Sequence, residues 1–97
     1  MGRRPVVLVG RRSSYRRRGA VIAVLVTTQA RHLDTEVSLG ADEGLPRPCV
    51  ANADKLLTFD KALLLDRPGA LSDEKLAALD DALRYALGLE RPSNTAY

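Results

Sequence analysis

The most constraining feature of this sequence is a ten-residue run, Gly19–Thr28, that is almost entirely apolar. Its large aliphatic residues occupy both odd and even positions, at Val21, Ile22, Val24, Leu25 and Val26. Most of them are β-branched, which favours an extended strand. Because successive side chains of a strand point to opposite faces, apolar residues at both parities need cover on both faces. The run therefore predicts a central strand rather than an edge strand.

Further strands are predicted before and after this run. Pro5–Val9 is β-branched, and its proline suits the first position of a strand, where no ladder donor is needed. Thr35–Leu39 alternates in polarity with the period of a half-buried strand. Cys49–Ala53 and Leu56–Phe59 indicate either one bent strand or two short ones, and Ala62–Leu65 is a further short apolar stretch. The intervening segments, Gly10–Arg18, Gln29–Asp34 and Gly40–Pro48, are expected to be loops or turns.

A C-terminal helix is predicted over about residues 72–87. Ser72 is a suitable N-cap, and Asp73 and Glu74 suit the positive end of the helix dipole. Gly88 is suited to the left-handed position just after the helix, with Leu89 placed for the contact that follows. The predicted buried face, at helical spacing, consists of Leu76, Leu79, Leu83, Ala86 and Leu87. Residues 90–97 are expected to be a flexible tail, which leaves 1–89 as one domain.

Several short strands followed by one amphipathic helix predict a mainly β fold, a small barrel or rolled sheet with the helix laid across it. A chain of 97 residues supports one compact core and has no room for a separate cofactor domain. Aromatic residues make up only 4% of the chain, so the core should be aliphatic and a row of base-stacking rings is not expected. Exposed strand edges and a modest core favour a dimer.

Charge is distributed very unevenly along the chain. Up to His32 there are eight arginines and no acidic residue, whereas from Leu33 onward seven basic residues face twelve acidic ones. A basic front half on a small domain is typical of a protein that binds a polyanion such as a nucleic acid. The competing explanation is codon usage in a GC-rich genome, which enriches surface arginine.

The remaining composition points to a soluble cytoplasmic protein. Cys49 is the only cysteine, so no intrachain disulfide can form, and its apolar neighbours predict a buried, inert thiol. Nothing resembles a signal peptide, and Ala20–Val26 is too short to span a bilayer. With one His, one Cys and scattered acidic residues, no spacing indicates a metal site, and no cofactor is predicted.

Five segments, in order, resemble the MazF/PemK family of toxins. They are Arg4–Val9, Val21–Thr28, Thr35–Val37 with Gly44 and Leu45, Leu56–Lys61, and Gly69–Leu71 with Leu87–Leu89. The family counterparts are an Arg-Pro-Val strand, an apolar strand ending in Thr or Ser, a Glu-Val…Gly-Leu passage, an Ile-Arg-Thr-Ile-Asp-Lys signature and the C-terminal helix. No single segment is specific, but their order and spacing make the resemblance strong. The resemblance runs from Arg4 to Leu89 and covers nearly the whole chain.

Two features depart from the family pattern. Its members usually begin with a strand reading roughly Arg-Gly-Glu-Val-Trp, followed by a flexible loop, and this chain starts at the second strand. Either the true start lies upstream, or the barrel is shortened and one sheet edge is open. Pro48 and Cys49 stand where many members carry Asp-Ser, a change expected to alter local structure more than chemistry.

The resemblance implies a homodimeric SH3-like barrel of the CcdB/PemK kind and the toxin of a type II toxin–antitoxin system. The implied activity is sequence-specific, metal-independent cleavage of single-stranded RNA through the 2′-hydroxyl, leaving a 2′,3′-cyclic phosphate and a 5′-hydroxyl. The implied partner is a MazE-like antitoxin. A non-enzymatic CcdB-like poison or binding protein and an inactive shortened relative are the alternatives, because fold alone does not fix function.

The resemblance assigns the catalytic roles to Arg4 and Thr27. A guanidinium stays protonated, so Arg4 is better suited to stabilising charge or donating a proton than to acting as a base. Without the resemblance, Arg4 would be interpreted as a solvated charge at a strand end. Residues expected to contact RNA are Arg3, Arg11, Arg12, Thr28, Gln29, Arg31, His32, Asp54 and Lys55. A general-base role for His32 competes with simple solvation, and Asp54 and Lys55 with ordinary strand-end charge.

Overall fold

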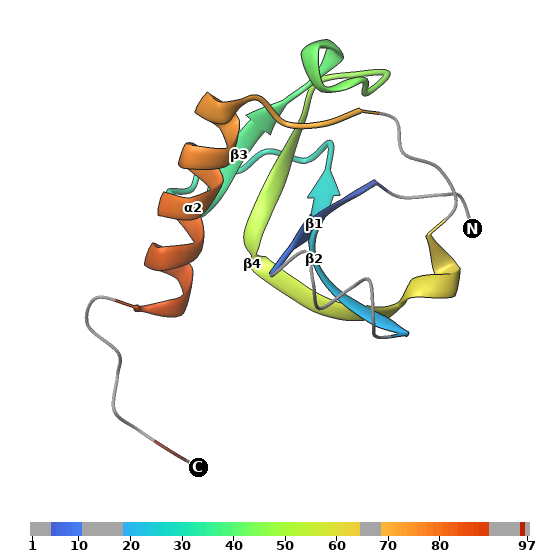
Figure 1. Cartoon of the computed structure of the whole chain (residues 1–97). Coiled ribbons are helices and arrows are strands. Elements are labelled where there is room, and N and C mark those ends of the chain that lie inside the picture. Colours follow the sequence, from blue (N-terminus) through green and yellow to red (C-terminus); the bar gives the residue numbers. More distant parts are fainter. Residues whose placement is uncertain (1–4, 11–18, 65–68, 90–95, 97) are drawn as a thin grey trace.

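The described residues form an antiparallel sheet followed by the helix α2 (Asp73–Leu87). A computed structural model describes residues 5–10, 19–64, 69–89 and 96. The sheet has the order β1-β2-β4-β3, from β1 (Val6–Val9), β2 (Ala20–Thr27), β3 (Glu36–Leu39) and β4 (Cys49–Asp60), and α2 (Asp73–Leu87) follows it (Figure 1). Two short 3-10 helices, η1 (Ala41–Glu43) and η2 (Lys61–Leu63), lie on either side of β4 in the sequence. The prediction of a mainly β fold with a C-terminal helix is confirmed.

Strand β2 is central, as the apolar run predicts. It pairs with β1 along one side and with β4 along the other. Val21, Ala23, Val24 and Val26 are each at most 5% exposed, so residues on both faces are buried. Ala20 and Ile22, at the start of the strand, are the exposed residues, and Ile22 is 45% exposed.

Strand β4 is one bent strand, which decides between the two sequence alternatives. Leu25 of β2 pairs with Asn52, whereas the preceding Val24 pairs with Leu56. Residues 53–55 therefore have no partner on β2, and this irregularity lies where the strand bends (Figure 1). Over residues 50–52, β4 pairs with both β2 and β3.

Both ends of α2 are set by the residues that the sequence indicates. The Ser72 hydroxyl oxygen accepts a hydrogen bond from the Lys75 N–H at 3.2 Å. At the other end Gly88 has φ 62°, and its N–H donates to the Tyr85 carbonyl at 3.3 Å. Leu89 N–H donates to the Arg84 carbonyl at 3.0 Å, which completes a Schellman-type C-cap.

The buried face of α2 differs from the predicted one. Leu79 and Ala82 are 3% and 4% exposed and pack against the sheet, with Leu83 and Ala86 partly buried beside them. The predicted face also included Leu76 and Leu87, which are 49% and 50% exposed. At 3.6 residues per turn these two lie about 60–80° to one side of Leu79, at the rim of the contact with the sheet.

The core between α2 and the sheet is aliphatic, as the composition predicts. Its buried members are Val24, Val26, Val37, Leu39, Cys49, Ala51, Ala53, Leu79 and Ala82. The Cys49 thiol is buried, and burial, followed by the charge of Glu43, raises its pKa. The prediction of a buried thiol is confirmed. Among the described residues, no helix combines the length and apolarity needed to cross a membrane.

Candidate functional site

Thr27 is the last residue of the central strand and lies beside the start of β1. It is partly buried and pairs with Val50 of β4. Its hydroxyl oxygen accepts a hydrogen bond from the Gln29 N–H at 3.2 Å, so its own proton can be donated elsewhere. The preceding residue, Val26, donates its N–H to the Pro5 carbonyl at 3.2 Å. The first described residue of the chain therefore contacts the strand end that carries Thr27.

The loop after Thr27 brings four of the predicted RNA-contacting residues into one exposed segment. Thr28, Gln29, Arg31 and His32 are all exposed and follow one another within residues 28–35. We call these eight residues the 28–35 loop. Hydroxyl, amide, guanidinium and imidazole groups together can both donate and accept hydrogen bonds, which is the repertoire needed at unpaired bases and phosphates.

The carboxylate of Glu36, the first residue of β3, closes this loop. The Arg31 N–H donates to both carboxylate oxygens, at 3.0 and 3.2 Å, and the Leu33 N–H donates to Oε1 at 3.1 Å. The Glu36 N–H in turn donates to the Leu33 carbonyl at 3.0 Å. His32, between Arg31 and Leu33, has φ 58°, in the left-handed region. Sequence reasoning assigned no role to Glu36, which it placed only in the Glu-Val passage that follows a polar loop.

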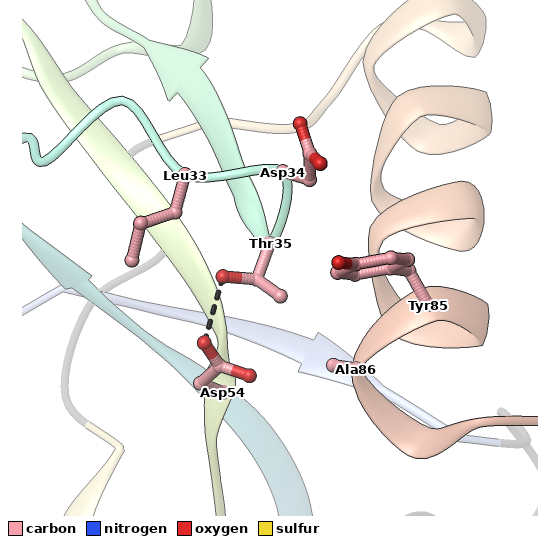
Figure 2. Close-up of a pocket in the computed structure, with 6 residues that line it drawn as sticks. All are labelled: Leu33, Asp34, Thr35, Asp54, Tyr85 and Ala86. Atoms are coloured by element: carbon pink, nitrogen blue, oxygen red, sulfur yellow. Dashed lines mark hydrogen bonds between the residues drawn. The ribbon is translucent and has the colours of Figure 1, made fainter.

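The other face of the loop borders a cavity of about 420 Å³ between the start of β3 and the end of α2. Figure 2 shows its lining residues: Leu33, Asp34, Thr35, Asp54, Tyr85 and Ala86. The Thr35 hydroxyl donates to Asp54 at 2.7 Å, and the Ala53 N–H donates to the Thr35 carbonyl at 2.8 Å. The irregular part of β4 therefore anchors the end of the loop. The carboxylates of this cavity repel phosphate and suit hydrogen-bond donors such as base amino groups.

The predicted site residues thus fall into three groups. Thr27 and the exposed residues of the 28–35 loop lie on one continuous segment, whereas Asp54 and Lys55 are exposed on the irregular part of β4. Arg3, Arg4, Arg11 and Arg12 lie outside the described residues. Within the described part of the chain, no three His, Cys, Asp or Glu side chains gather as metal ligands.

Comparison with known proteins places this geometry in context. The family model for PemK-like, MazF-like toxins of type II toxin–antitoxin systems matches residues 1–87. The probable endoribonuclease MazF5 of Mycobacterium tuberculosis is 34% identical over 93 residues, covering 94% of this chain and 84% of the relative. The solved M. tuberculosis toxin MazF-mt6 superposes with a TM-score of 0.83 at 30% identity, covering 88% of this chain and 86% of that one. A mycobacterial endoribonuclease in complex with its cognate antitoxin gives 0.83 at 32% identity, covering 94% and 86%.

Proposed function

Because the chain belongs to the PemK-like, MazF-like family of type II toxins, we propose that it is an endoribonuclease that cleaves single-stranded RNA. The observation that carries the proposal is the extent of the match, which runs over residues 1–87 and so spans every strand and α2. Relatives and solved neighbours that match most of the chain are named endoribonucleases or MazF toxins. None of them favours a non-enzymatic, CcdB-like poison.

The proposed reaction is an internal displacement at phosphorus. The RNA 2′-oxygen attacks the adjacent phosphorus, and the bond from phosphorus to the 5′-oxygen breaks. The 2′-hydroxyl proton passes to a base and the 5′-oxygen gains a proton, which leaves a 2′,3′-cyclic phosphate and a 5′-hydroxyl. The charge that builds up on the phosphate oxygens has to be stabilised by fixed donors. The reaction as proposed needs no metal ion.

Thr27 is suited to this task because of its hydrogen bond with Gln29. The Gln29 N–H holds the hydroxyl oxygen and leaves the hydroxyl proton to be donated to a phosphate oxygen. Arg4 precedes Pro5, whose carbonyl contacts the end of β2, and its guanidinium would supply a fork of donors to the same phosphate. We assign transition-state stabilisation to both residues.

Substrate contacts are proposed for the exposed groups around Thr27. Thr28, Gln29, Arg31 and His32 would contact the RNA from the 28–35 loop, and Asp54 and Lys55 from β4. Arg3, Arg11 and Arg12 would steer the strand electrostatically, which makes binding depend on salt concentration. Contacts to bases as well as phosphates would make the cleavage sequence-specific.

The activity is tested by incubating the purified protein with a long RNA in excess EDTA and mapping the cleavage ends. We expect cuts at one short recurring sequence. Thr27→Val should lower kcat by about 100-fold, the usual effect of removing one transition-state donor, whereas Thr27→Ser should keep most of the activity. Arg4→Ala should reduce cleavage at least as much. Absence of cleavage by the wild-type protein at high concentration would overturn the proposal.

Assembly and partners follow the same family relationship. We propose a cytoplasmic homodimer that a MazE-like antitoxin neutralises, in keeping with the solved neighbour that is complexed with its cognate antitoxin. Light scattering should give about 21 kDa for the dimer of this 10.5 kDa chain. A stable monomer at micromolar concentration would contradict the dimer.

A further inference from the structure

His32 adopts a backbone conformation that is uncommon for any residue other than glycine. Its φ of 58° lies in the left-handed region, where the Cβ of a residue other than glycine crowds the following carbonyl oxygen. The side chain is exposed, and its imidazole makes no hydrogen bond to any residue that the structure describes. Neither burial nor a polar contact of the His32 side chain with the described residues compensates for the strain. Strain of this kind concentrates at functional sites.

The hydrogen bonds on either side of His32 come from a single acceptor. The Arg31 and Leu33 N–H groups both point at the Glu36 carboxylate, which is partly buried at the start of β3. Further along, the loop is fixed to β4 by the hydrogen bonds of Thr35 to Ala53 and Asp54. These contacts fix the backbone on both sides of residue 32, as a strained conformation requires in order to persist.

We propose that Glu36 is a positioning residue for base selection, which holds the 31–33 turn so that the His32 imidazole is presented to an RNA base. The proposal rests on the ribonuclease function proposed above. An imidazole can stack on an unpaired base and form hydrogen bonds with its edge. His32 follows Thr27 by five residues, so the base that it reads would lie near the scissile phosphate. Glu36 itself touches neither the RNA nor the reacting atoms.

The test compares base preference in four variants. Short RNAs that differ from the preferred one by a single base are cleaved by Glu36→Ala, Glu36→Gln and His32→Gly, with Glu74→Ala as a control. Glu74 is exposed in the first turn of α2, so its removal changes the charge equally but leaves the loop intact. We expect Glu36→Ala and His32→Gly to lower discrimination by roughly tenfold, through KM rather than kcat, as expected when a base contact is lost.

Glu36→Gln should give an intermediate loss, because the amide oxygen can still accept from the Arg31 and Leu33 N–H groups while the negative charge is gone. Glu74→Ala should behave as the wild type does. A second measurement needs no RNA: amide NMR spectra of Glu36→Ala should shift the Arg31 and Leu33 resonances and leave those of α2 in place. If Glu36→Ala does not fold, Glu36→Gln and His32→Gly carry the test.

The outcomes separate the two proposals. If the wild-type protein cleaves RNA and both Glu36→Gln and His32→Gly keep its base preference, the positioning role is wrong and the ribonuclease function stands. If the wild-type protein cleaves no RNA, the proposed function fails and this inference fails with it. A variant that loses thermal stability but keeps full discrimination also contradicts the inference, because it shows a purely structural role for Glu36.

Discussion

The loops on either side of β3 are each held by a glutamate carboxylate that accepts backbone N–H groups, but the two glutamates differ in burial. Before β3, the Glu36 carboxylate accepts backbone N–H groups from the 28–35 loop. After β3, the Glu43 carboxylate accepts the Gly40 N–H at 2.6 Å, while the Glu43 N–H donates to the Gly40 carbonyl at 3.0 Å. Glu43 is only 7% exposed, whereas Glu36 is partly exposed and the loop that it holds is mostly open to solvent.

The two loops also differ at their left-handed residue. After β3 this residue is Gly44, with φ 82°, which adopts the conformation without steric penalty. Before β3 it is His32, which does not. The loop after β3 therefore combines a buried carboxylate with the residue type best suited to a left-handed position. In the 28–35 loop the carboxylate of Glu36 holds a left-handed residue that is not glycine.

The largest effect is expected where Gly69 approaches the backbone of Glu43, in the loop after β3. A Cβ on Gly69 would lie 2.3 Å from the Glu43 carbonyl oxygen and 2.9 Å from its carbon, both backbone atoms that cannot move aside cheaply. Gly69→Ala should therefore lower the free energy of unfolding by about 3 kcal/mol, the upper range for overpacking. Gly19→Ala is the matched control, because its Cβ would meet nothing within 4 Å. Urea unfolding measures both, and equal effects would contradict the contact.

Removing the Glu43 carboxylate should lower the free energy of unfolding more than removing the Glu36 carboxylate. Glu43→Ala leaves the partly buried Gly40 N–H without its acceptor and should cost about 2 kcal/mol of unfolding free energy. Glu36→Ala frees N–H groups of exposed residues, which water can satisfy, and should cost about 1 kcal/mol or less. Urea unfolding of the two variants under one set of conditions tests this order. A larger loss for Glu36→Ala would reverse the comparison.

Exchanging the left-handed residues should change stability in opposite directions. His32→Gly relieves the steric penalty and should raise the free energy of unfolding. The increase should not exceed about 1 kcal/mol, because the greater entropy of glycine in the unfolded chain offsets part of it. Gly44→Ala introduces the penalty and should lower it by about the same amount. Thermal unfolding with matched buffers measures both. A loss of stability in His32→Gly would show that the histidine is favoured by the fold itself.

The smallest effect concerns Cys49, whose pKa is raised from its ordinary value of 9.0 by burial and then by the charge of Glu43. A raised folded-state pKa contributes stability that is fully present below the unfolded pKa and is lost as the pH rises through the folded value. The free energy of unfolding should therefore fall above pH 9, and this part of the fall should be absent in Cys49→Ala. Glu43→Gln should reduce it. Unfolding at pH 8 and pH 10 provides the comparison, and identical pH dependence of Cys49→Ala and wild type would argue against it.

How much of the fold follows from the sequence depends on how local each signal is. Ser72 and Gly88 end the helix through contacts with their own neighbours, so the sequence alone predicts them. The exposure of Leu76 and Leu87 depends on where the sheet ends, which no helical spacing can show. The sequence leaves open whether Cys49–Phe59 is one bent strand or two short ones, because the bend depends on the pairing of β4 with β2.

The residues of the candidate site also differ in how much the sequence shows of their role. Thr27 shows in the sequence only as a hydroxyl at the end of an apolar strand, and the family resemblance supplied its role. Glu36 shows in the sequence only as part of the Glu-Val passage, because its hydrogen bonds depend on a left-handed turn at His32 that the sequence did not predict. Asp54 was predicted as an RNA contact, and its carboxylate accepts the Thr35 hydroxyl, a partner 19 residues away in the sequence. The RNA contact of Asp54 remains a prediction.

The double pairing of β4 over residues 50–52 has a consequence for how the molecule opens. A strand hydrogen-bonded along both edges exchanges its amide protons only in the rarest and largest openings, whereas a surface loop exchanges in frequent local ones. Thr27 pairs with Val50 and therefore lies in the slowest-opening part of the sheet. The 28–35 loop begins one residue later. We therefore expect the Thr27 amide to exchange far more slowly than the exposed amides of the 28–35 loop.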